Sequence, residues 1–243
     1  MHSQVHVRQS DGRPFAIVQV DEPNGPGPED NTYFLCVSTL DEGADEWREL
    51  GRLVEGSRSR PDTPAHAGTN WGTTLRFSFA TSSDGDRLVV AYVDRIQPLD
   101  QVFVQEIAID EEGDLGAVLS DEIVRPTSME FQLLPALTVG PGGTGLSFYE
   151  MVTAPDETRP EADTVRVIAA TPAAGAAWST FPLSDEAFDP CPTTTRSYFG
   201  DYIGIAPVGT RFVTAWADSR DGCDHQNSSA DTFHQHTYAD VWQ

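Results

Sequence analysis

The chain has no lysine, few cysteines and no long apolar run. All 15 of its basic residues are arginines, and they stand against 38 acidic residues, for a formal net charge of −23. A surface that binds nucleic acid needs the opposite excess, so this class of partner is disfavoured. No run approaches the roughly 18 apolar residues of a membrane-spanning helix. Residues 1–10 alternate polar and apolar side chains and so do not resemble a signal peptide.

Three cysteines are too few for a disulfide framework, and the odd number leaves at least one without a partner within the chain. The excess of carboxylate has two interpretations. It keeps a secreted or salt-exposed protein dispersed, or a few of the carboxylates bind a cation. Composition does not decide between them.

Short segments of alternating or apolar side chains, separated by Gly, Pro and Asp turns, fill the sequence. None has the period of an amphipathic helix, so all are predicted to be β-strands. The predicted strands are residues 4–8, 15–21, 32–38, 47–53, 74–81, 88–94, 102–109, 115–124, 131–139, 146–151, 164–170, 178–183, 202–207, 212–218 and 231–241.

The segment RFVTAWADSRD, residues 211–221, recurs upstream in degenerate form. RLVVAYVDR, GLSFYE and PFAIVQVD align with it, and each copy contributes one acidic residue to the same column. These residues are Asp21, Asp94, Glu150 and Asp218. Their spacing is that of a supersecondary unit, which indicates a repeat protein.

Four sequential antiparallel strands, repeated four times, predict an all-β fold with a β-propeller architecture in one domain, residues 1–243. The predicted blades span about residues 3–53, 72–124, 130–184 and 196–243. The last blade lacks a fourth strand, so we expect part of a larger propeller of six or seven blades, with a compact four-bladed ring as the alternative. A β-sandwich also has many short strands, but it does not explain the acidic column.

Two turns between third and fourth strands resemble the Asp-box, Ser/Thr-x-Asp-x-Gly-x-x-Trp. TPAAGAAW, ending at Trp178, has the spacing but carries Ala173 in place of the aspartate. TLDEGADEW keeps Asp41 but has one extra residue before Trp47. Residues 199–206 and 215–220 are also similar to the closing blades of bacterial secreted proteins of the sialidase-like BNR/Asp-box repeat family.

The resemblance implies structural roles for the box residues. Its aspartate, here Asp41, accepts hydrogen bonds from turn amides, Gly43 adopts positive φ, and the tryptophan packs between sheets. These roles concern folding and imply nothing about catalysis.

Propeller geometry brings the start of each first strand and the end of each second strand to one face. The acidic column lies there, with Asp201 and Tyr202 at the start of the last blade. The long loops lie on the same face, where function tends to reside. They span residues 22–31, 54–72, 152–163, 185–200 and 219–230.

A sialidase-type reaction needs an arginine cluster for the sugar carboxylate, a carboxylic acid, and a tyrosine nucleophile paired with a glutamate. Arg95 and Arg220 are the candidates for the cluster, Tyr202 or Tyr198 for the phenol, and Glu150 or Asp94 for the carboxylate. The family's N-terminal arginine motif and acid/base aspartate segment have no match here, so catalysis is not assured. The predicted ligand-binding residues are Asp21, Asp94, Asp201, Asp218 and Tyr198.

Asp201, Asp218 and Asp221 offer the oxygen ligands that Ca²⁺ prefers. The simpler alternative is that such strand-end carboxylates cap loop amides or pair with arginine. The same propeller geometry brings Cys191 near Cys223, so we predict a disulfide, which would indicate an oxidising compartment.

The leading hypothesis is therefore a secreted, sialidase-like propeller module that binds carbohydrate or another extracellular ligand on its loop-rich face. Two alternatives stay open: an active exo-sialidase-type glycoside hydrolase, and a structural module of a larger surface protein.

Overall fold

The computed structural model describes residues 2–22, 32–57, 77–96, 99–126, 128, 130–152, 164–173, 177–188, 203–218, 220 and 236–243. Their regular structure is entirely β-strand, as predicted, and each of the predicted strands is present. No helix in this part of the chain is long and apolar enough to cross a membrane.

The first half of the chain forms two antiparallel sheets, each of four strands in sequence order. Sheet 1 consists of β1 (His2–Val7), β2 (Pro14–Glu22), β3 (Thr32–Thr39) and β4 (Arg48–Ser57). Sheet 2 consists of β5 (Phe77–Thr81), β6 (Arg87–Ile96), β7 (Leu99–Ile109) and β8 (Leu115–Ile123).

The second half repeats this plan with one strand fewer at its end. Sheet 3 consists of β9 (Phe131–Gly140), β10 (Gly143–Val152), β11 (Thr164–Pro172) and β12 (Trp178–Pro182). Sheet 4 consists of β13 (Ile203–Val208), β14 (Arg211–Asp218) and β15 (His236–Trp242).

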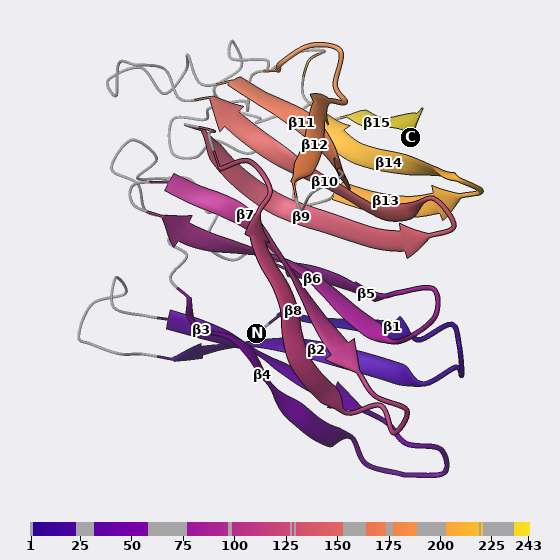
Figure 1. The fold of residues 1–243 in the computed structure, drawn as a ribbon. Helices are drawn as coiled ribbons and strands as arrows, with labels where there is room; N and C mark the ends of the chain where they lie inside the picture. Colours follow the sequence, from indigo (N-terminus) through magenta and orange to yellow (C-terminus); the bar gives the residue numbers. More distant parts are fainter. Residues whose placement is uncertain are drawn as a thin grey trace, which may run out of the picture.

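The four sheets follow one another as the blades of a four-bladed propeller (Figure 1). Their first strands are neighbours, because β1 contacts β5, β5 contacts β9 and β9 contacts β13. In the part of the chain that the structure describes, sheets 1 and 4 share no contact of similar extent. The propeller prediction is confirmed, and membership in a larger ring of six or seven blades stays a prediction.

Three apolar layers hold the sheets together, one between each pair of neighbours. They arise from the two-residue period of strands, which sends alternate side chains to opposite faces. In β6, for example, Val90 and Tyr92 pack toward sheet 1, whereas Val89 and Ala91 pack toward sheet 3. A strand covered on both faces therefore reads as a continuous apolar run.

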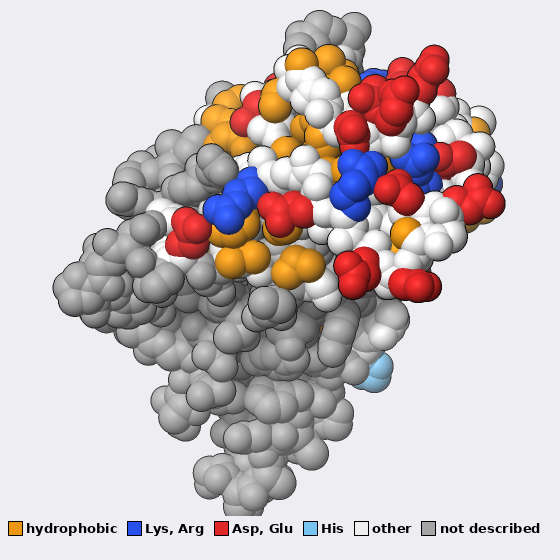
Figure 2. All heavy atoms as spheres, turned by 90° about the horizontal axis from the view of Figure 1, so that it is seen from below, with side chains coloured by type: hydrophobic (Ala, Val, Ile, Leu, Met, Phe, Trp, Pro, Cys, Tyr) orange, Lys and Arg blue, Asp and Glu red, His pale blue; other side chains and the backbone are white. Residues whose placement is uncertain are grey.

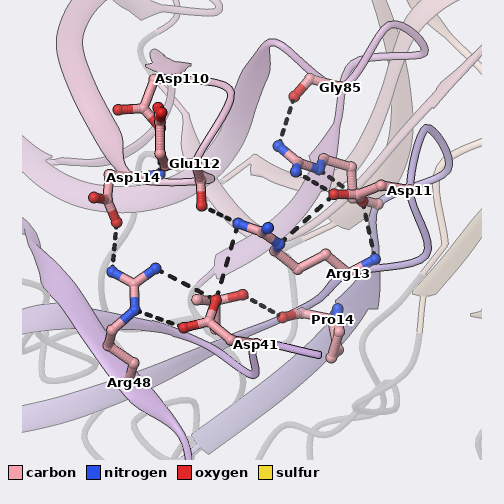
Figure 3. Close-up of polar contacts among 11 residues, drawn as sticks. Asp11, Arg13, Pro14, Asp41, Arg48, Gly85, Asp110, Glu112 and Asp114 are labelled. Carbon is pink, nitrogen blue, oxygen red and sulfur yellow. Dashed lines mark hydrogen bonds and ion pairs between the residues drawn. The ribbon is translucent and has the colours of Figure 1, made fainter. Parts of the chain in front are cut away.

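At the end of the propeller where short turns connect the strands, arginine side chains link the turns of sheet 1 to those of sheet 2 (Figure 3). Arg13 donates to the carbonyl oxygen of Glu112 across the gap. Arg48 pairs with Asp114 of sheet 2 and, at 2.9 Å between Nε and Oδ2, with Asp41 of its own sheet. These ion pairs are partly exposed, so their contribution to stability is modest.

The Asp-box roles of the β3–β4 turn are only partly confirmed. Gly43 does adopt a φ of +75°. The carboxylate of Asp41, however, binds the Arg48 guanidinium rather than turn amides, and Trp47 is 46% exposed instead of packed between sheets. Both predictions were wrong: Arg48 takes up the Asp41 carboxylate, and the extra residue before Trp47 changes the position of this side chain relative to the sheet. Trp178, in the copy with the regular spacing, does pack against the layer between sheets 2 and 3.

Candidate functional site

The two ends of the propeller differ in their connections (Figure 1). Tight turns such as those at residues 82–86 and 141–142 close one end. The opposite end, where second strands finish and first strands begin, is joined to the predicted long loops, and we call it the loop-bearing end. The loops themselves lie largely outside the described residues.

Three acidic residues of the repeat column lie at equivalent places at this end. Asp94, Glu150 and Asp218 each lie at or near the last residue of the second strand of sheets 2, 3 and 4. All three share a face with side chains that pack toward the preceding sheet, as alternation from Tyr92, Phe148 and Trp216 shows. Asp21 belongs to β2, and its side chain lies outside the described part.

Glu150 is the centre of a group of charged side chains. It has no exposed surface, and both of its carboxylate oxygens accept hydrogen bonds. Arg166, its cross-strand neighbour on β11, donates to Oε1 from Nε at 2.9 Å and from a terminal nitrogen at 2.6 Å. Arg125 donates to Oε2, as does the Ser128 hydroxyl at 3.2 Å. Arg166 also reaches Glu130, with 3.4 Å between nitrogen and Oε2.

This group balances two guanidinium groups against two carboxylates. Burial raises the pKa of Glu150 above its ordinary value, although the hydrogen bond from Arg166 and the charge of Arg125 oppose this shift. Glu150 is enclosed, whereas the side chains of Arg125, Arg166 and Glu130 keep about a quarter to a third of their surface exposed. The accessible part of the group thus carries both donors and acceptors.

Glutamine side chains fix the position of this group relative to sheet 2. Gln132 lies on β9, opposite Glu150 of β10, and is fully buried. Its Oε1 accepts a hydrogen bond from the Val102 amide at 2.9 Å. Its amide nitrogen donates to Gln101 Oε1 at 3.2 Å, and Gln101 in turn donates to the carbonyl of Glu130 at 3.0 Å. Two neighbouring blades therefore hold the site rigidly.

A second ion pair lies at the same end on sheet 4. Asp218 is fully buried and accepts from Arg220 at 2.9 Å and 2.6 Å through the guanidinium and at 2.8 Å through the backbone amide. Trp216 Nε1 donates to the same carboxylate at 3.3 Å. The guanidinium also binds Asp185 and lies 4.2 Å from the centre of the Tyr238 ring. Hydrogen bonding to Asp218 raises the pKa of Arg220, which keeps its charge.

The predicted site residues are thus brought together only in part. Glu150, Asp218 and Arg220 lie at the predicted end, but arginine or acidic partners occupy all three. The side chain of Arg95 lies outside the described residues. So do Tyr198, Asp201, Tyr202, Asp221, Cys191 and Cys223, hence the calcium site and the disulfide stay predictions. Among the described residues, no group of three or more acidic, His or Cys side chains is arranged for a metal ion.

Four residues of the group around Glu150 were not among the predicted site residues: Arg125, Ser128, Glu130 and Arg166. Arg166 interrupts the apolar run of residues 165–170 in β11, and this was the available signal. Recognising its meaning required the register that pairs it with Glu150. Arg125 comes from the connection after β8, for which no sequence pattern predicts a partner.

The fold is similar to that of solved propeller enzymes. A levansucrase variant from B. megaterium superposes with a TM-score of 0.54 at 9% identity, over 99% of this chain and 66% of that chain. A B. subtilis levansucrase variant gives 0.51 at 10% identity, over 99% and 67%. An α-L-arabinofuranosidase from Lactobacillus brevis gives 0.47 at 11% identity, over 98% and 71%.

This chain therefore spans about two thirds of the levansucrase chains, and identities this low show the fold alone. No protein-family model matches the sequence, and neither does any curated protein. Both levansucrase variants carry a name that denotes action on carbohydrate.

Proposed function

We propose that the loop-bearing end of this propeller binds carbohydrate. The observation that carries the proposal is the group around Glu150, in which the buried carboxylate holds partly exposed Arg125 and Arg166, and Arg166 in turn binds partly exposed Glu130. Sugar hydroxyls both donate and accept hydrogen bonds, so a binding surface needs both kinds of group in fixed positions. The fold similarity to levansucrase supports the same class of ligand without establishing it.

The ligand is an uncharged sugar rather than an acidic one. A site for a sugar carboxylate needs guanidinium groups whose positive charge is not already neutralised by the protein's own carboxylates. Here Arg166 is shared between Glu150 and Glu130, Arg125 is paired with Glu150, and Arg220 is paired with Asp218 and Asp185. The net charge of −23 also repels anions. This argues against the sialidase-type reaction implied by the sequence resemblance.

Binding without hydrolysis by these carboxylates is the function supported best. A glycosidase places two carboxyl groups where they flank the scissile bond. Glu150 and Asp218 are both fully buried under their arginine partners, so neither reaches a substrate. Secretion, which an extracellular carbohydrate ligand would require, is part of the proposal.

A glycan array followed by titration calorimetry tests the proposal. We expect wild-type protein to bind one or more neutral glycans and Arg166→Gln to bind them at least about tenfold more weakly, one lost charge-assisted contact being worth about 1.5–3 kcal/mol. Arg48→Gln, at the opposite end, is the control and should bind like wild type. Silence toward neutral glycans would overturn the proposal, and turnover of a fluorogenic sialoside that Arg220→Ala abolishes would establish the sialidase alternative.

A further inference from the structure

Among the residues that the structure describes, no sheet packs on one face of sheet 4. Phe212, Trp216 and Trp242 pack on sheet 3, so the alternate side chains point away from it. Cross-strand register places apolar residues on this face, together with Arg211 and Thr237. The apolar residues are Val208, Val213, Ala215, Ala217, Ala239 and Val241. Val208 is 51% exposed and Val241 47%. We call this apolar surface the outer face of sheet 4.

The equivalent face of sheet 2 is covered. The repeat alignment of RLVVAYVD with RFVTAWAD sets Val89 against Val213, Ala91 against Ala215 and Val93 against Ala217. In sheet 2 these residues are fully buried, because Leu146 and Phe148 of sheet 3 pack on them. The same small side chains on sheet 4 therefore suit another sheet that presents apolar side chains.

Sheet 1 offers such a surface at the other end of the row of blades. Phe15 and Ile17 pack on sheet 2, so Ala16, Val18 and Val20 point outward. The register of β1 adds two residues to this face, Val5 and Val7, which are 64% and 52% exposed. Seen from the side of sheet 1, hydrophobic side chains lie open to view among acidic and basic ones (Figure 2). We call this surface the outer face of sheet 1.

We propose that two copies of this chain associate head to tail, with the outer face of sheet 4 of one copy packed on the outer face of sheet 1 of the other. A single chain carries both halves of the contact, on its first and last sheets. Two such contacts related by a two-fold axis close a dimer in which neither apolar face is left in water. Contiguous apolar surfaces of this kind mark sites of association.

Val208 and Val7 are the residues to probe. Each lies on the innermost strand of its sheet, at the end with tight turns, and each is about half exposed, so a charged side chain disturbs no internal packing. Between two apolar faces, however, a buried unpaired arginine opposes association strongly. Leu119 on β8, 54% exposed and on neither outer face, is the control.

Sedimentation velocity and light scattering across a range of concentrations provide the measurement. We expect wild type and Leu119→Arg to reach about twice the monomer mass of 26.5 kDa, and Val208→Arg and Val7→Arg each to stay monomeric with an unchanged circular dichroism spectrum. Should either variant unfold, Val241→Arg or Val5→Arg replaces it.

A mixture of the two variants makes the test specific. Val208→Arg keeps an intact sheet 1 and Val7→Arg an intact sheet 4, so an equimolar mixture should form heterodimers through one contact although neither variant associates alone. Wild-type protein that stays monomeric would overturn the proposal. So would a mixture that remains monomeric, or a loss of association in Leu119→Arg as large as in the two face variants.

Discussion

The hydroxyl of Tyr149 bonds to both polar groups of the Ala217 backbone. It accepts from the amide nitrogen at 3.0 Å and donates to the carbonyl oxygen at 3.0 Å. Tyr149 is fully buried on β10, and Ala217 precedes Asp218 on β14, so one phenol fixes sheet 4 against sheet 3 beside the ion pair of Arg220. Burial raises the pKa of Tyr149, which keeps the hydroxyl protonated as this geometry requires.

Tyr149→Phe should lower the free energy of unfolding by about 1–3 kcal/mol, since the ring packing is retained but two buried backbone groups lose a partner. Urea unfolding followed by tryptophan fluorescence measures the change. An unchanged midpoint would show that the hydroxyl does not hold the two sheets together.

The two carboxylates bound to Arg220 should differ sharply in their contribution to stability. Asp218 is fully buried and Asp185 is 82% exposed. Asp218→Asn removes the buried partner of a guanidinium that is itself only 11% exposed, and this should cost about 3 kcal/mol or more. Asp185→Asn is the matched control and should cost less than about 1 kcal/mol, because solvent screens the exposed pair.

Thermal and urea unfolding of both variants give the comparison. Equal losses of unfolding free energy in the two variants would contradict the assignment of Asp218 as the main partner of Arg220. A larger loss in Asp185→Asn would make Asp185 the main partner instead.

The strands and their sheets could be predicted because the information is local. Alternation or a short apolar run between turn residues marks each strand, and short turns make sequential neighbours pair, as at residues 141–142 between β9 and β10. The repeat also placed Glu150 and Asp218 correctly. Their partners could not be predicted, since Arg166 meets Glu150 only through register and Arg125 arrives from a connection. Trp47 was misplaced because its turn has one extra residue.

Glycines in two strands provide a test of the packing between sheets. A Cβ built on Gly145 would lie 2.7 Å from the Phe212 ring of sheet 4, whereas a Cβ on Gly204 meets nothing within 4 Å. Gly145→Ala should therefore destabilise the protein by about 1–3 kcal/mol through overpacking. Gly204→Ala should be neutral or stabilise slightly, because it restricts only the unfolded chain.

Differential scanning calorimetry of the two alanine variants measures the melting temperature of each and so compares their stability. If Gly145→Ala left the melting temperature within error of Gly204→Ala, the close approach of β10 to Phe212 would not exist in solution.

Asp11 should make stability depend on pH in a defined acidic range. Its carboxylate accepts from Arg8 Nε at 2.9 Å and from the Arg13 amide at 3.0 Å. The hydrogen bond from Arg8 is the main cause that lowers the pKa of Asp11 from 3.8 to about 2. The unfolded chain thus binds a proton at Asp11 more readily than the folded protein does. The stabilisation is present above pH 3.8 and is lost as the pH falls toward about 2.

Asp11→Asn isolates this effect from the titration of the other carboxylates. The difference in unfolding free energy between wild type and variant should be constant near neutral pH, shrink as the pH falls below 3.8, and approach a lower limit near pH 2. Urea unfolding at a series of pH values measures it. Since the carboxylate is 37% exposed, 1 M salt should reduce the pH-dependent part. A difference that stays the same from neutral pH to pH 2 would mean that Arg8 does not bind the ionised carboxylate.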